Sequence, residues 1–114
     1  MSIATDHTAA VMLLASISFR LQPHKRGEVL SAVDETIIRM RGAAGCTRTR
    51  LLADTDDPNA FTIHSEWQSA ADADAFFASR EFQLFRGLRM LLRDEPIIVI
   101  DEIRSRVTRL VRTP

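Results

Sequence analysis

Residues 57–69, DPNAFTIHSEWQS, contain the end of a turn, a complete strand and the first residue of a helix. The turn covers residues 54–59, where Asp, Pro and Asn each have a known preference for turn conformations. Residues 60–67 place apolar side chains on one face, which is typical of a half-buried strand. Ser69 followed by Asp72 resembles a capping box and predicts that a helix begins there. The fold is therefore expected to contain a strand that leads directly into a helix.

The sequence before this unit predicts two more strands with a helix between them. Residues 11–19 alternate as a strand, and residues 25–41 change to a helical period. Gly42 and Gly45 should end that helix, because glycine accepts the left-handed backbone that often follows a helix. Residues 46–53 predict a strand that forms a hairpin with the next one. The apolar positions of the helix are Leu30, Val33, Ile37 and Met40.

The sequence after this unit predicts a pair of helices and a last strand. The first helix reaches about residue 78, and Ser79 is the expected N-cap of a second helix that continues to Leu92. Pro96 breaks the second helix, and residues 97–107 predict a strand that begins as an unbroken apolar run. The resulting order is the split βαββαβ pattern of ferredoxin-like folds. We therefore expect an α+β protein with an antiparallel sheet and helices on one face.

The other face of such a sheet needs a cover of its own, because the helices can cover only one face. The last strand begins with apolar residues on both faces, at residues 97–100. A matching sheet from a second copy of the chain is the simplest cover. We therefore expect a homodimer in which two sheets form an α/β barrel.

The length and composition of the chain indicate one domain. Residues 11–108 are expected to form it, with flexible tails at 1–10 and 109–114, since 114 residues is the usual size of one domain. The formal net charge is zero with both signs interspersed, which argues against a nucleic-acid partner. The apolar run 11–15 is too short for a signal or membrane helix, so no membrane partner is expected. Cys46 is the single cysteine, which suits a reducing cytoplasm.

Three segments of the chain resemble the antibiotic biosynthesis monooxygenase family. Residues 19–25, FRLQPHK, are similar to the family's passage from the first strand into the first helix. Residues 45–51, GCTRTRL, are similar to the start of its second strand. The strongest similarity lies in residues 57–69, where residues 66–69, EWQS, match the family's glutamate-tryptophan-any-serine core. The resemblance implies the ferredoxin-like fold and the dimeric barrel.

The resemblance also implies a chemistry and the residues that serve it. Cofactor-free members of the family oxidise electron-rich phenols, and the substrate anion itself reduces oxygen. Trp67 matches the family's tryptophan, and Arg86 matches the arginine that serves the anion. The family's asparagine and tyrosine are replaced by Ile63 and Ala73, which favours a non-oxidative reaction as an alternative.

The sequence contains no recognisable set of ligands for a cofactor or a metal. The haem-degrading branch of the family has an asparagine, a tryptophan and a histidine ligand at the positions of Ile17, Phe76 and Arg86, so its axial ligand is missing. Cys46 and His64 do not have the spacing of a metal site. We therefore expect no haem, no other cofactor and no metal.

These residues together define a candidate site. Arg86 would hold the substrate anion, and His64 could act as a base because histidine titrates near neutral pH. The catalytic candidates are Trp67, Arg86 and His64, and the expected substrate pocket is formed by Ile17, Ile63, Ser65, Phe76 and Phe77. The expected function is a cofactor-independent monooxygenase that acts with O₂ on a small phenolic or polycyclic anion.

Each candidate also has a purely structural interpretation. Trp67, Phe76 and Phe77 would then be core residues. Arg86 would extend its charge to solvent along an apolar stem, and His64 would be a hydrogen-bonded interface residue. Two other functions stay open: an isomerase or detoxifying enzyme for a small carbonyl metabolite, and a ligand-binding dimer without turnover. The fold does not choose among these functions, because function belongs to the site.

Overall fold

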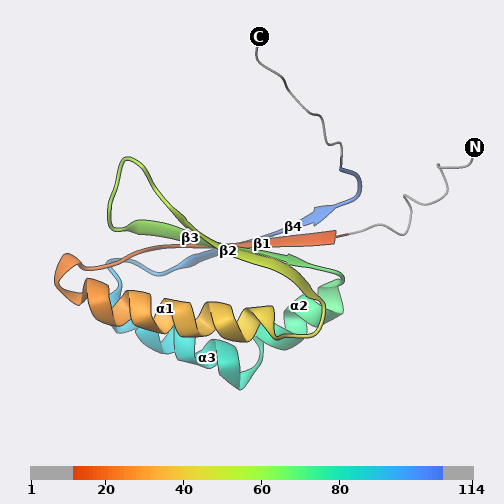
Figure 1. Ribbon diagram of the computed structural model, residues 1–114, viewed down its shortest axis with the longest axis horizontal. Coiled ribbons are helices and arrows are strands. Elements are labelled where there is room, and N and C mark those ends of the chain that lie inside the picture. The colour runs from red at the N-terminus through yellow and green to blue at the C-terminus, as the bar shows by residue number, and fades with distance from the viewer. Residues whose placement is uncertain (1–11, 107–114) are drawn as a thin grey trace, which may run out of the picture.

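The computed structural model describes residues 12–106, which form a four-stranded antiparallel sheet with helices on one face (Figure 1). The strand order β2-β3-β1-β4 confirms the expected ferredoxin-like βαββαβ arrangement. In chain order the elements are β1 (Met12–Arg20), η2 (Pro23–Lys25), α1 (Arg26–Arg41), β2 (Cys46–Ala53), β3 (Ala60–Trp67), α2 (Ala70–Phe77), α3 (Arg80–Arg86), η3 (Gly87–Leu91) and β4 (Ile97–Ile103). The expected tails at residues 1–10 and 109–114 lie outside the described residues, as do Val11 and residues 107–108.

The two faces of the sheet differ because strand residues alternate between them. The helix-facing side of β1 consists of buried apolar residues, and its opposite side is partly or fully exposed. In β3 the same alternation runs from Phe61 to Trp67. The expected hairpin of β2 and β3 is confirmed, and it opens with the turn after Ala53, where the Asp54 carboxylate accepts a 2.7 Å hydrogen bond from the backbone N–H of Asp56. The buried β1 residues are Leu13, Ala15, Ile17 and Phe19.

Helix α1 buries a wider stripe than the expected one. Val29 and Thr36 are fully buried in addition to the expected positions, whereas Leu30 is only half-buried. The Thr36 hydroxyl can be buried because it donates a 3.0 Å hydrogen bond to the carbonyl of Ala32. Gly45 adopts the expected left-handed backbone with a φ of 82°. The remaining buried residues of α1 are Val33, Ile37 and Met40.

The end of α1 corrects one expectation. Gly42 is the C-cap with a φ of −89°, so its backbone is right-handed and only Gly45 makes the left-handed turn. The Gly42 N–H continues the helical pattern by donating to Ile38 and Arg39, which explains why no reversal occurs there. The reversal is needed three residues later, where the chain enters β2 at Cys46.

The two helices after β3 begin where expected. Ser69 caps α2 by accepting a 3.1 Å hydrogen bond from the Asp72 N–H, and Ser79 caps α3 by accepting one from Phe82. The expected continuation of α3 to Leu92 is wrong, because the helix ends at Arg86 and tightens into the 3₁₀ turns of η3. Glycine at position 87 has low helix propensity, which favours the change at this point.

Strand β4 is shorter than expected. It ends at Ile103 and not at residue 107, because Ile103 pairs with Met12, the first residue of its neighbour β1. The apolar residues at the start of β4 are exposed on both faces of the sheet, because β4 is an edge strand. Among residues 12–106, no helix is both long enough and apolar enough to cross a bilayer.

Candidate functional site

Trp67 lies in the layer between the sheet and the helices and is fully buried. Its indole N–H donates a 2.9 Å hydrogen bond to the Ser65 hydroxyl, which in turn lies 3.4 Å from the Ala15 carbonyl. Its ring packs against Phe76 and Phe77 at centroid distances of 5.5 and 5.9 Å. A buried indole needs a partner for its N–H, and the protein itself supplies one here.

Three further residues expected at the pocket occupy the same interior. Ile17 and Ile63 are directly opposite each other on β1 and β3, and both are fully buried. Phe76 is 6% exposed and packs between Trp67 and Phe82. Together with Ser65 they form an interior that is already filled by side chains. None of these four side chains lines the hollow between the helix pair and β4.

An open hollow lies next to this interior, between the helix pair and the edge strand β4. Its volume is about 540 Å³. Two residues of the expected site, Phe77 and Arg86, line it. The other lining residues are Asp74, Ala78, Gln83, Ile98 and Ile100. We call it the Arg86 hollow.

The Arg86 hollow stays open because the helices do not fully cover β4. Ile98 pairs with Ile17 and Ile100 pairs with Ala15, so both side chains lie on the helix-facing side of the sheet. Ile98 and Ile100 nevertheless remain 37% and 42% exposed, whereas their β1 partners are fully buried. The hollow therefore has an apolar floor at the edge of the sheet.

Arg86 places a positive charge at this apolar hollow. It is the last residue of α3 and is exposed, with its guanidinium carbon 5.2 Å from the centroid of the Phe82 ring. Stacking on an aromatic face leaves the edge of a guanidinium free to donate hydrogen bonds. Within residues 12–106 no carboxylate forms an ion pair with Arg86. Its forked donors can thus meet an anionic ligand.

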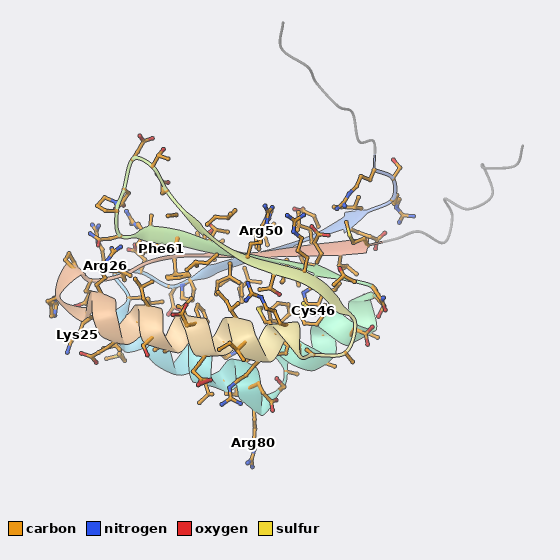
Figure 2. The ribbon with its side chains drawn as sticks, in the orientation of Figure 1. Lys25, Arg26, Cys46, Arg50, Phe61 and Arg80 are labelled. Atoms are coloured by element: carbon orange, nitrogen blue, oxygen red, sulfur yellow. The ribbon has the colours of Figure 1, made fainter. Side chains whose placement is uncertain are left out.

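His64 lies on the other side of the sheet and is half-buried. It pairs in register with Ser16 of β1 and Arg50 of β2. Arg50 points away from the helices (Figure 2). The expectation that His64 and Trp67 point to opposite faces is confirmed, and the sheet separates His64 from the Arg86 hollow.

A second hollow of about 490 Å³ lies at the end of the sheet formed by the β2–β3 turn. Arg20 reaches Asp94 there through a 2.9 Å hydrogen bond from its Nε, so these charges compensate each other. Ser18 and Thr62 are joined by their hydroxyl groups at 3.1 Å. In the described part of the chain, no group of three or more His, Cys, Asp or Glu side chains could hold a metal ion.

Five residues of the Arg86 hollow were not expected from the sequence: Asp74, Ala78, Gln83, Ile98 and Ile100. For Ile98 and Ile100 a signal existed, because the last strand is apolar on both faces and one face must meet the helices. Asp74 is an exposed residue of a helix that has two acidic residues, and nothing in the local sequence distinguishes it from solvent-facing charges.

The sheet topology and the hollow between the helix pair and the edge strand define a ferredoxin-like α+β domain with a ligand-sized recess. The family model described as antibiotic biosynthesis monooxygenase matches residues 12–88. The chain belongs to this family. Among curated proteins, none matches the chain.

Solved structures of distant relatives share the fold. A conserved protein from Methanosarcina mazei Go1 has a TM-score of 0.76 and 20% identity, covering 82% of this chain and 94% of that one. A structure described as an antibiotic biosynthesis monooxygenase has a TM-score of 0.74 and 23% identity, covering 84% and 99%. PA3566 from Pseudomonas aeruginosa has a TM-score of 0.71 and 21% identity, covering 88% and 98%. At these identities the similarity establishes the fold.

Proposed function

We propose that the protein is a cofactor-independent monooxygenase that oxidises a small phenolic or polycyclic anion with O₂ in the Arg86 hollow. The proposal rests on one observation. Within residues 12–106 no carboxylate pairs with the guanidinium of Arg86, which lies beside the apolar floor of the hollow. Membership of the antibiotic biosynthesis monooxygenase family supports the same class of reaction.

Each part of the hollow has a role in this reaction. Arg86 favours the ionised form of a phenol through charge-assisted hydrogen bonds. Phe77, Ile98 and Ile100 offer an apolar surface on which the aromatic rings can lie. The electron-rich anion then reduces O₂, and one phenol with one O₂ gives one para-quinone and one water.

The direct test is oxygen uptake with 1-naphthol and with anthrone, which would give 1,4-naphthoquinone and anthraquinone. We expect the purified protein to accelerate oxygen uptake and to form quinone in a one-to-one ratio with the oxygen consumed. A chelator in the buffer should leave the rate unchanged, because the substrate anion is the reductant. If both substrates bind but oxygen uptake equals that of buffer alone, the oxygenase proposal is wrong.

A second candidate is a non-oxidative role for the same hollow, as an isomerase or detoxifying enzyme or as a ligand-binding protein. The buried apolar side chains of Ile63 and Ala73 favour it, since they stand where the resemblance implies the asparagine and the tyrosine that serve the oxidation. The hydrogen bond between Trp67 and Ser65 has the same implication, because it occupies the indole N–H. Ligand binding without oxygen uptake would favour this candidate.

We also propose that the protein is a homodimer in which the open faces of two sheets pack together. The support is the exposed apolar run at the start of β4, which includes Val99 on the open face opposite Ser16. The open face further carries the exposed Leu52 on β2. An apolar sheet face of this kind is normally buried against another layer.

Light scattering at micromolar concentration should give twice the mass of one chain. Val99→Asp should shift the mass to that of a monomer, because the interface would bury an unpaired charge. Leu84→Asp is the matched control: Leu84 is 52% exposed on α3, compared with 46% for Val99, and this variant should remain dimeric. A folded wild-type protein with the mass of one chain would contradict the proposal.

A further inference from the structure

Two opposite charges line the Arg86 hollow without meeting each other. Asp74 comes from α2 and Arg86 comes from α3. Within residues 12–106 neither side chain forms an ion pair. The hollow thus offers both a cationic donor and an anionic acceptor to one ligand.

The packing of the helices keeps the two charges at the hollow. On α2, Ala73 and Phe76 face the core, so Asp74 and Phe77 face the hollow. On α3, the ring of Phe82 lies under the Arg86 guanidinium. A ligand on the apolar floor would therefore meet a donor group from α3 and an acceptor group from α2.

We propose that Asp74 determines substrate specificity by accepting a hydrogen bond from a second, neutral hydroxyl group of the ligand. This inference rests on the proposed function for the role of the hollow, and it predicts that aromatic monoanions with at least one further hydroxyl are preferred over those, such as the anion of 1-naphthol, that have none. An ionised carboxylate has acceptors but no donor, so it cannot satisfy a methoxy group or a second carboxylate. Like-charge repulsion would also disfavour dianions.

The test compares the binding of three probes by titration calorimetry: 3-hydroxy-2-naphthoate, 3,5-dihydroxy-2-naphthoate and 3,7-dihydroxy-2-naphthoate. All three carry a carboxylate for Arg86 and a 3-hydroxyl whose proton is held in an internal hydrogen bond to that carboxylate, and two carry a further, free hydroxyl at different positions. We expect wild-type protein to bind at least one dihydroxy probe about tenfold more tightly than the monohydroxy probe, since a hydrogen bond to a charged group has this effect.

Asp74→Ala should remove this preference and strengthen binding of the monohydroxy probe by about twofold, because an exposed like charge is removed. Asp34→Ala is the matched control. Asp34 is exposed on α1 and does not line the hollow, so the preference should remain in this variant. Thermal melting of both variants should match the wild type, since neither carboxylate has an ion-pair partner among residues 12–106.

Two kinds of failure can be separated. If the monohydroxy probe binds and loses affinity in Arg86→Met, but neither dihydroxy probe is preferred, the inference about Asp74 is wrong and the proposed function stands. The same holds if the preference survives Asp74→Ala. If the monohydroxy probe does not bind, or binds equally well to Arg86→Met, both the Arg86 site and the inference built on it are overturned.

Discussion

Trp67→Ala should lower the free energy of unfolding by about 3–5 kcal/mol, the range measured for large aromatic residues removed from a core. Trp67 is fully buried and contacts both Phe76 and Phe77. Its removal would leave a cavity between β3 and α2 and a Ser65 hydroxyl without its indole partner. Urea denaturation followed by circular dichroism measures the change. Because small domains have a total stability of roughly 5–15 kcal/mol, this loss is a large fraction of the whole and should lower the urea midpoint measurably.

Trp67→Phe separates packing from hydrogen bonding. It keeps an aromatic ring between Phe76 and Phe77 but removes the donor to Ser65, so we expect a loss of about 1–2 kcal/mol. A loss below about 1 kcal/mol in Trp67→Ala would contradict the interpretation of Trp67 as a core residue. A direct role of Trp67 toward substrate would instead show as a change in ligand affinity in Trp67→Phe.

Arg86→Met should weaken binding of 3-hydroxy-2-naphthoate about tenfold or more. Hydrogen bonds to charged groups contribute about 1.5–3 kcal/mol, and the exposure of Arg86 places the expected value near the lower end. Methionine keeps an apolar stem against Phe82 and removes the forked donors. The melting temperature should change little, because within residues 12–106 no carboxylate pairs with Arg86.

Arg80→Met is the matched control for Arg86→Met. Arg80 lies at the start of the same helix and extends away from the sheet into solvent (Figure 2). This variant loses the same charge, so any general effect of net charge on anion binding appears in both proteins. The opposite pattern, unchanged binding with a lower melting temperature in Arg86→Met, would show that Arg86 stabilises the fold and does not bind the ligand.

Local sequence patterns predicted most of the fold. The bounds of β2 and β3 follow from alternation and from the turn between them, and both match the structure at Cys46–Ala53 and Ala60–Trp67. The caps at Ser69 and Ser79 are also local signals, since each involves the residue three positions later. The ends of helices and strands were predicted less well where they depend on neighbouring elements of the fold. The last strand stops where its neighbour begins, and α3 tightens at Gly87, which no periodicity reveals.

The candidate site was predicted only in part, for a physical reason. Alternation correctly placed Trp67 and His64 on opposite faces of the sheet. The Arg86 hollow, however, is formed where the helix pair meets the edge strand, and Ile98 and Ile100 come from a different part of the sequence than Asp74 and Phe77. Whether side chains fill such a junction or leave it open depends on tertiary packing distances. Ile17 and Ile63 were expected to line the substrate pocket, but both are fully buried in the layer between the sheet and the helices.

The environment of Trp67 has a consequence for how the protein can be observed. The chain contains one tryptophan and no tyrosine, so its near-ultraviolet fluorescence excited above the phenylalanine band comes from this one indole. Phe77 contacts the indole at 5.9 Å between centroids and also lines the Arg86 hollow, so one ring separates the fluorophore from a bound ligand. An aromatic ligand that absorbs near the tryptophan emission band would therefore quench it by energy transfer. Occupancy of the hollow and unfolding of the core could be followed by the same intrinsic signal, without a label.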